Sequence, residues 1–304
     1  MSLGIQRLGH VALTAPDPAA AARFAIERLG FSLAFSGEDG SQHLAAGGID
    51  PYCLVYVPGD APGLDHAAYV VPDAATLEAA TTALRARGVE VQEHEEPGEG
   101  PTVRFRTPAG HRLELIVGRS TEIPVAHLVE PPSGAPAPIC PDHIGLGAAD
   151  FDAEVAFACD VLGMLRSTRV LAPDGSPVMT FLRLPDRLLY HQLVVAATPA
   201  AVLHHVQFTL KSLDSFYAAH DALQAAGVDI QWGPLRHGPG HNVAMYLQDG
   251  AGIWVEYSVE EEIILDDDNY EPRTWSVTDP HVIDEWSSGP PPEALMGPPA
   301  GARA

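Results

Sequence analysis

Residues 8–31 read LGHVALTAPDPAAAARFAIERLGF, and residues 141–164 read PDHIGLGAADFDAEVAFACDVLGM. A constant shift of 133 residues aligns the two stretches along their whole length. The shift pairs His10 with His143, Asp17 with Asp150, Phe24 with Phe157, Leu29 with Leu162 and Gly30 with Gly163. Apolar, capping and turn residues therefore recur in one order, which is the mark of an internal repeat.

Two further pairs of segments extend this repeat. LDHAAYVV at 64–71 matches LHHVQFTL at 203–210 under a shift of 139, which places His66 on His205. The closing segments match under a shift of 142, which places Glu114 on Glu256. Because the shift changes between segments, each copy consists of two related halves, and the chain holds four such units.

Each unit shows the same succession of patterns. A short alternating strand leads through an Asp suited to cap a helix, and the amphipathic helix ends at a Gly. Three further strands follow, separated by Gly, Pro and Asp. The pattern predicts an α+β fold of four βαβββ modules paired into two domains. We expect an N-terminal domain at 1–129, a Pro-rich linker at 130–141, a C-terminal domain at 142–260 and a tail at 261–304.

The tail is acidic at first and rich in Pro and Gly after Trp286. We expect a disordered end, and the segment from Trp275 onward is a candidate lid.

Composition excludes several classes of function. With 40 acidic and 17 basic residues among 304, the net charge of −23 would repel a phosphate backbone, so we expect no nucleic-acid partner. The sequence contains no apolar run long enough to span a membrane. Its three cysteines are odd in number and widely spaced, which is typical of a protein from a reducing cytoplasm.

The repeat brings three metal-ligating residue types to equivalent strand positions in the C-terminal copy. His143, His205 and Glu256 lie on separate predicted strands, where each side chain can point inward. Two imidazoles and one carboxylate can hold Fe(II), Mn(II) or Zn(II) from one side and leave positions open for substrate and O2. We therefore predict a metal site at these residues.

Three more residues fit acid–base and oxygen-stabilising roles around that site. His191 can exchange protons near neutral pH, so it is a candidate base and later acid. His237 and Tyr246 are placed to donate hydrogen bonds toward negative charge on oxygen. His204 is expected on the opposite face of its strand and not as a ligand. His241 either lines the pocket or caps a turn.

The N-terminal copy leaves an alternative open. His10, His66 and Glu114 occupy the places of the predicted ligands, whereas Tyr52, Glu95 and Arg104 replace His191, His237 and Tyr246. We expect this triad to be structural or a spare metal site.

Candidate substrate contacts fall into two groups, which predict opposite chemical properties of the substrate. Phe181, Trp232 and Trp254 would form an apolar pocket for a substituted or bicyclic ring, while Arg183, Arg187 and Arg236 would meet a carboxylate.

The order and spacing of LHHVQFTL, GPLRHG, Tyr246 and Glu256 resemble the last module of the vicinal oxygen chelate superfamily, and within it the type I extradiol ring-cleaving dioxygenases. The resemblance spans residues 5–260. It implies that His143, His205 and Glu256 bind Fe(II), with Mn(II) as an alternative. It also implies that His191 is the acid–base, and that His237 and Tyr246 lie over the site of O2 and substrate. The intact N-terminal triad departs from the pattern of many members.

The implied activity is insertion of both atoms of O2 into a catechol beside its hydroxyls, in aromatic catabolism, by an enzyme that forms a homo-oligomer. A glyoxalase-type isomerase or lyase shares the fold but usually has four protein ligands. A ligand-sequestering resistance protein needs the cleft without redox chemistry. Retention of His191, His237 and Tyr246 favours the dioxygenase.

Overall fold

The computed structural model describes residues 3–118, 137–185 and 187–296, and it contains four βαβββ modules. Module 1 consists of β1 (Arg7–Ala15), α1 (Pro18–Arg28), β2 (Ser32–Ser36), β3 (Gln42–Ala45) and β4 (Leu54–Pro58). Module 2 consists of β5 (Gly63–Val71), α2 (Ala74–Ala86), β6 (Val91–Glu96), β7 (Gly100–Arg106) and β8 (Arg112–Val117). Module 3 consists of β9 (Cys140–Ala148), α3 (Phe151–Asp160), β10 (Leu165–Leu171), β11 (Pro177–Arg183) and β12 (Leu193–Ala197). Module 4 consists of β13 (Val202–Thr209), α4 (Leu213–Ala225), β14 (Ile230–Arg236), β15 (Val243–Gln248) and β16 (Trp254–Val259).

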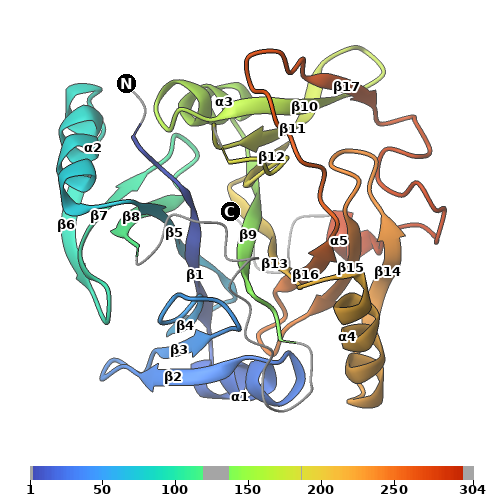
Figure 1. The fold of residues 1–304 in the computed structure, drawn as a ribbon, viewed down its shortest axis with the longest axis horizontal. Helices are drawn as coiled ribbons and strands as arrows, with labels where there is room; N and C mark the ends of the chain where they lie inside the picture. Colours follow the sequence, from blue (N-terminus) through green and yellow to red (C-terminus); the bar gives the residue numbers. More distant parts are fainter. Residues whose placement is uncertain (1–2, 119–136, 186, 297–304) are drawn as a thin grey trace.

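The modules pair into two mixed sheets, which confirms the predicted fold class. Modules 1 and 2 form the sheet β2-β3-β4-β1-β5-β8-β7-β6. Modules 3 and 4 form the sheet β14-β15-β16-β13-β9-β12-β11-β10-β17, in which β17 is Arg273–Ser276. In each sheet the first strands of the two modules are antiparallel neighbours, β1 with β5 and β9 with β13. β1 and β9 run side by side in the centre of the molecule (Figure 1).

The helix boundaries follow from the repeated caps. Asp17 accepts a hydrogen bond from the backbone nitrogen of Ala20, and Asp150 accepts one from that of Ala153. Gly30 and Gly163 follow the helices with φ of 81° and 79°, a left-handed conformation that favours glycine. The shared residues of the repeat therefore start and stop the helices of modules 1 and 3. Asp73 caps α2 in the same way, but Ser212 caps α4, so the predicted Asp cap does not hold for module 4.

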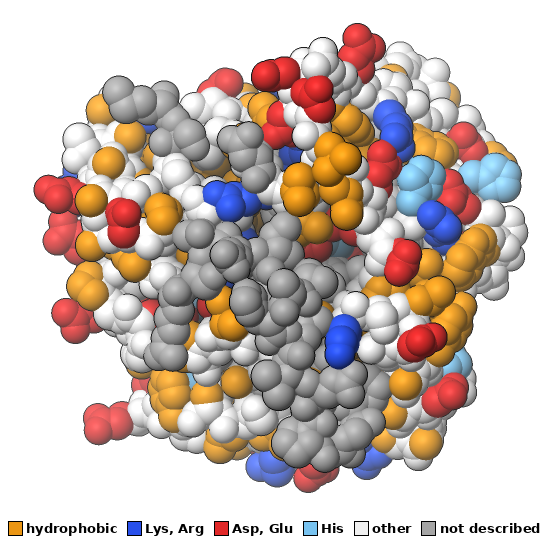
Figure 2. Space-filling model, in the orientation of Figure 1, with side chains coloured by type: hydrophobic (Ala, Val, Ile, Leu, Met, Phe, Trp, Pro, Cys, Tyr) orange, Lys and Arg blue, Asp and Glu red, His pale blue; other side chains and the backbone are white. Residues whose placement is uncertain are grey.

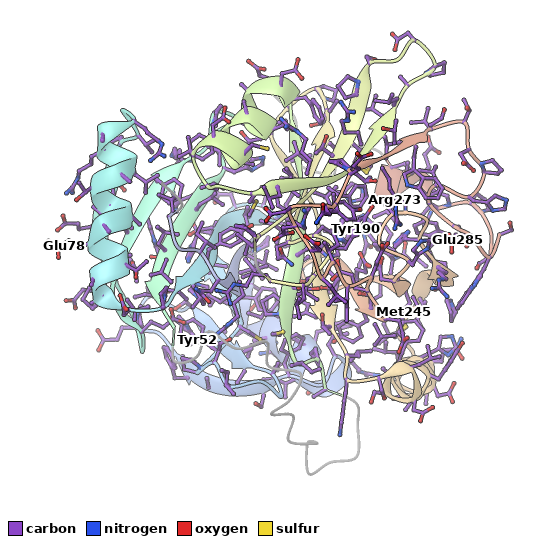
Figure 3. All side chains as sticks on the ribbon, turned by 45° about the horizontal axis from the view of Figure 1, so that its top comes forward. Tyr52, Glu78, Tyr190, Met245, Arg273 and Glu285 are labelled. Carbon is purple, nitrogen blue, oxygen red and sulfur yellow. The ribbon has the colours of Figure 1, made fainter. Side chains whose placement is uncertain are left out.

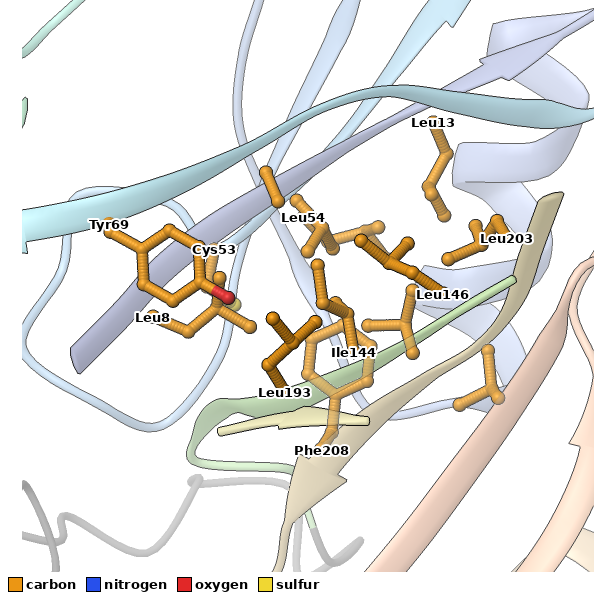
Figure 4. Close-up of a cluster of buried hydrophobic side chains, with 14 of the residues drawn as sticks. Leu8, Leu13, Cys53, Leu54, Tyr69, Ile144, Leu146, Leu193, Leu203 and Phe208 are labelled. Atoms are coloured by element: carbon orange, nitrogen blue, oxygen red, sulfur yellow. The ribbon is translucent and has the colours of Figure 1, made fainter. Parts of the chain in front are cut away.

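The two halves of the chain share one hydrophobic core. Leu8, Leu13 and Leu54 from the N-terminal half pack in the same cluster as Ile144, Leu146, Leu193 and Phe208 from the C-terminal half (Figure 4). Polar contacts tie the halves as well, since the Tyr257 hydroxyl donates to the carbonyl of Leu29. The predicted domain boundary at residue 129 lies outside the described residues.

The hydroxyl of Tyr56 donates a hydrogen bond of 2.7 Å to Asp249 Oδ2 across this interface, and both residues are buried. We expect Tyr56→Phe to lower the free energy of unfolding by about 1–3 kcal/mol, because a buried carboxylate oxygen loses its donor. Denaturant unfolding measures the change. Tyr69→Phe is the matched control, since the buried Tyr69 hydroxyl has no hydrogen-bond partner within the part of the chain that the structure describes. Equal stabilities of the two variants would contradict the prediction.

Part of the predicted tail folds onto the second sheet. β17 pairs in parallel with β10 at the sheet edge, and Leu189 forms a bridge with Ile263. A short helix, α5 (Glu293–Met296), follows. The segment 261–296 is thus ordered against the C-terminal half, and the predicted disordered end falls partly on residues 297–304, outside the described part.

The surface agrees with the composition. On the visible face, the basic side chains of the described residues are scattered and form no continuous stripe (Figure 2). Within the described residues, none of the helices has the length and apolar character needed to cross a membrane.

Candidate metal centre and active site

Three adjacent strands of the second sheet bring the predicted ligands together. His143 lies on β9, His205 on β13 and Glu256 on β16, and the sheet order places these strands next to one another. The Nε2 atoms of the two histidines are 3.0 Å apart, and Glu256 Oε2 lies 3.5 Å from His143 Nε2 and 3.3 Å from His205 Nε2. Three donor atoms therefore converge on one point, all within 4.8 Å of one another.

The protonation states around this point suit a cation. All three side chains are buried. Burial lowers the pKa of His143 to about 3, which keeps its imidazole neutral. Burial alone would raise the pKa of Glu256, but hydrogen bonds with His143 and His205 hold it well below its ordinary value. Neutral imidazoles and an ionised carboxylate are the forms that bind metals.

Glu256 is held in place by two further side chains. The Asn242 amide donates to Oε1 at 2.9 Å, and the Tyr246 hydroxyl donates to Oε2 at 2.6 Å. Tyr246 is placed by the strand register, because it lies directly opposite Glu256 in the β15–β16 pair. Such support orients a metal ligand and tunes its basicity.

His237 completes a short hydrogen-bond chain to the site. Its Nδ1 lies 2.7 Å from the carbonyl oxygen of Ile283 and therefore carries the proton, while its Nε2 lies 2.9 Å from the Tyr246 hydroxyl. Burial lowers the pKa of His237 and raises that of Tyr246. The single hydroxyl proton of Tyr246 thus has two possible acceptors, His237 Nε2 and Glu256 Oε2.

His191 lies beside His143, one of the three predicted ligands. Its ring centroid lies 4.0 Å from that of His143, and burial lowers its pKa to about 3. Its Nδ1 lies 2.6 Å from Glu261 Oε1, and its backbone nitrogen donates to the same oxygen at 2.9 Å. Glu261 therefore holds the backbone of His191 and lies against its ring, although Nδ1 has no aligned hydrogen bond among the described residues, and His191 lines the cavity.

A cavity of about 550 Å³ is lined by the three predicted ligands, His143, His205 and Glu256. This volume falls within the range of small-molecule sites. Its walls are mainly apolar and include Val170, Met179 and Phe181. Part of the tail, residues 277–280, 282–283 and 295–296, closes one side. Among the described residues that line it there is no lysine or arginine, and Asp279 is the one carboxylate besides Glu256.

The predicted substrate contacts divide into two groups. Phe181 and Trp232 line the cavity, and the Trp232 ring stacks on Tyr246 with centroids 5.2 Å apart. Trp254 is buried in the cluster beneath it and does not line it. Arg236 and His241 do not line the cavity either. Both contact Glu285: Arg236 Nε lies 3.5 Å from its Oε2, and His241 Nδ1 lies 3.0 Å from its Oε1.

Arg183 is occupied elsewhere. It is buried, its Nε donates to Asp267 Oδ1 at 2.8 Å, and its guanidinium stacks over the Tyr270 ring. It therefore offers no charge to a ligand in the cavity.

The expectation that the His204 side chain points away from the site was wrong. His204 lines the cavity, and its Nδ1 lies 2.7 Å from Nδ1 of His205. The pairing of β13 with β9 shifts register between Leu203 and His205, so strict alternation fails at this point. His204 is not in the ligand group, as expected.

Sequence reasoning missed two supporting residues, Asn242 and Glu261. Asn242 lies four residues before Tyr246, and on a strand this spacing puts both side chains on one face, so alternation could have found it. Glu261 lies beyond the end of β16, and no sequence pattern connects it with His191.

The model of the Glyoxalase/Bleomycin resistance protein/Dioxygenase superfamily matches residues 7–115 and 141–257. The chain belongs to this superfamily. A metapyrocatechase from Pseudomonas sp. (strain CF600) is 29% identical over 92% of this chain and 93% of that protein. A manganese-dependent 2,3-dihydroxybiphenyl 1,2-dioxygenase from Geobacillus genomosp. 3 is 26% identical over 90% of this chain and 91% of that protein.

Solved structures share the fold over nearly the whole chain. A 2,3-dioxygenase from Pseudomonas sp. KL28 is 26% identical, with a TM-score of 0.79 over 90% of this chain and 98% of that one. A Mn(II)-bound glyoxalase from Novosphingobium aromaticivorans is 23% identical, with a TM-score of 0.80 over 97% of this chain and 95% of that one. Since both kinds of enzyme share the fold, the fold alone does not choose between them.

Proposed function

We propose that the protein is an extradiol ring-cleaving dioxygenase that inserts both atoms of O2 into a catechol next to its hydroxyl groups. Fe(II) is the proposed cofactor, with Mn(II) as the alternative. The observation that carries the proposal is the three-donor group of His143, His205 and Glu256 at the floor of an apolar cavity, beside His191. The full-length likeness to relatives named as catechol-type dioxygenases supports the same activity.

The donor set fits a reduced transition-metal ion. Two imidazole nitrogens and one carboxylate oxygen already face one point, and the ligand Glu256 is ionised. A bound ion of this kind would supply coordination for both catechol oxygens and for O2, together with electron transfer between them. A set of three protein ligands leaves room for these partners, whereas a glyoxalase-type site usually adds a fourth protein ligand.

The surrounding residues would handle protons and charge. His191, beside Glu261, would take a proton from a catechol hydroxyl and later return a proton to an oxygen of the product. The Tyr246 hydroxyl would stabilise negative charge that develops on oxygen, and His237, as an acceptor beside it, would orient this phenol. The apolar walls exclude water, which strengthens both effects.

The cavity also indicates the substrate class. A catechol that carries a carboxylate would find no basic partner on the described lining and would approach Asp279. Phe181, Met179 and Trp232 instead suit alkyl or aryl substituents. We therefore propose uncharged catechols, with apolar substituents, as substrates.

The test is anaerobic loading of the full chain with Fe(II), and separately with Mn(II), followed by a panel of catechols. Catechol, 3-methylcatechol and 2,3-dihydroxybiphenyl represent the proposed class, and 3,4-dihydroxyphenylacetate the charged one. We expect a coloured ring-fission product with one O2 consumed per product. The value of kcat/KM should be at least about 10-fold higher for the uncharged members, the cost of a buried unpaired charge.

Absence of O2 uptake with every catechol and both metals would refute the dioxygenase activity. A preference for the acid-bearing member would refute only the proposed substrate class. We further propose a cytoplasmic location and a homo-oligomeric assembly, which fractionation and light scattering test.

A further inference from the structure

The N-terminal half contains a second group of potential metal ligands. His10 lies on β1, His66 on β5 and Glu114 on β8, three neighbouring strands of the first sheet. Glu96, at the end of β6, joins them, and one donor atom from each of the four lies within 4.8 Å of the others. All four residues are buried. Tyr52, beside this group, lies in the N-terminal half, while Tyr190, the neighbour of His191, lies in the C-terminal half (Figure 3).

Its geometry repeats that of the C-terminal centre. The Nε2 atoms of His10 and His66 are 3.0 Å apart, the same distance as between His143 and His205. Glu114 Oε2 lies 3.1 Å from His66 Nε2 and 3.8 Å from His10 Nε2. The residues face one point as the proposed active-site ligands do.

One of the two histidines is oriented as a metal ligand by a carboxylate on its far side. Asp65 Oδ2 lies 2.7 Å from Nδ1 of His66, within hydrogen-bond distance. A carboxylate at one ring nitrogen directs the other nitrogen to a metal in many protein sites. Glu99 Oε1 lies 3.4 Å from Nδ1 of His10, but this nitrogen has no aligned hydrogen bond among the described residues.

Only one of the two carboxylate oxygens of Glu114 accepts hydrogen bonds from the described residues. Its Oε1 accepts hydrogen bonds from Thr102 and, at 2.9 Å, from Arg104. Its Oε2 is fully buried, faces the two imidazoles and has no aligned hydrogen-bond donor among the described residues. In the C-terminal centre the matching oxygen accepts from Tyr246, so the N-terminal carboxylate is the freer of the two.

Carboxylates are concentrated around this point. The side chains of Glu96, Glu99 and Glu114 are at most 7% exposed, and Arg104 is bonded to Glu96 and Glu114. His94 Nε2 also lies 3.3 Å from Glu96 Oε2. Buried carboxylates beside two imidazoles whose Nε2 atoms face each other at 3.0 Å are a donor set that suits a divalent cation.

We propose that His10, His66, Glu96 and Glu114 bind a second divalent transition-metal ion in a closed, structural site. Glu96 is the fourth ligand, whereas Glu95, the counterpart of His237 in the sequence, is exposed. Tyr52, where the C-terminal half has His191, fills the adjoining space with Phe35 and His43, whose rings stack at 4.1 Å. Among the described residues, this packing fills the side of the site where the C-terminal half has His191 and its cavity, and we therefore infer a structural role.

The test counts metal ions per chain after chelation, reconstitution of the full-length protein with Zn(II) and removal of free ion. Zn(II) binds nitrogen and oxygen donors more tightly than Fe(II) or Mn(II), so it survives the separation. We expect two ions in the unmodified chain, one in Glu256→Gln, one in Glu114→Gln and none in the double variant. The count is independent of catalytic activity.

One ion in the unmodified chain together with none in Glu256→Gln would overturn the proposal. Two ions retained in the double variant would also overturn it, because the zinc would then lie elsewhere. If Glu114→Gln does not fold, Glu256→Gln still decides the question by its own count. Glu96→Gln should keep three ligands and lose about 10-fold or more in zinc affinity by chelator competition, and an unchanged affinity would remove Glu96 from the site.

Discussion

Glu256→Gln should lower kcat/KM for ring cleavage by at least about 1,000-fold, a loss of about 4 kcal/mol in transition-state stabilisation. Glu256 is the one anionic member of the C-terminal donor group, and its Oε2 faces both imidazoles. A neutral amide can place an N–H toward the metal position and binds a cation poorly. Steady-state kinetics in the presence of Fe(II), with metal analysis of the same sample, measure the effect.

Glu154→Gln is the matched control for this substitution. Glu154 is also a buried glutamate of the C-terminal half, but it lies on α3, away from the cavity lining, and accepts a hydrogen bond from the backbone nitrogen of Ala109. A glutamine oxygen can still accept that bond, so activity should change little. Full activity of Glu256→Gln with bound iron would show that this carboxylate is not a ligand.

His191→Asn should reduce kcat by about 100-fold to 10,000-fold, the usual contribution of a positioned acid–base group. Bound metal should remain, because His191 is not one of the three ligands. The pH dependence of kcat should change shape as well, since the group that exchanges the proton is lost. Rapid mixing of the catechol complex with oxygenated buffer separates this loss from a loss of binding.

His220→Asn serves as the control for His191, because His220 lies on α4 and does not line the cavity. It should leave kcat and the pH profile unchanged. An unaltered kcat in His191→Asn would assign the proton transfers to another group, and a loss of metal in this variant would assign His191 to the ligand set instead.

The internal repeat predicts most of the fold. The caps Asp17 and Asp150 and the glycines at 30 and 163 recur because every module needs the same helix start and stop. Strand alternation then places His143, His205 and Glu256 on one face of neighbouring strands. These are local rules of the backbone, and they can be applied to the sequence alone.

The tertiary structure decided what depends on irregular or distant contacts. The register shift in β13 turned His204 toward the cavity, although alternation places it on the other face. Glu261 lies beside His191, and Glu96 joins the N-terminal group, because of loop and strand-end geometry that the sequence does not indicate.

Residues of the tail form part of the cavity wall. Arg183 binds Asp267 and stacks on Tyr270, and so does not line the cavity. Sequence by itself determined the modules and the three-residue donor set, because these follow from short-range periodicity and repetition. Only the folded chain decided which charges reach the cavity, since that depends on which segments far apart in sequence pack against each other.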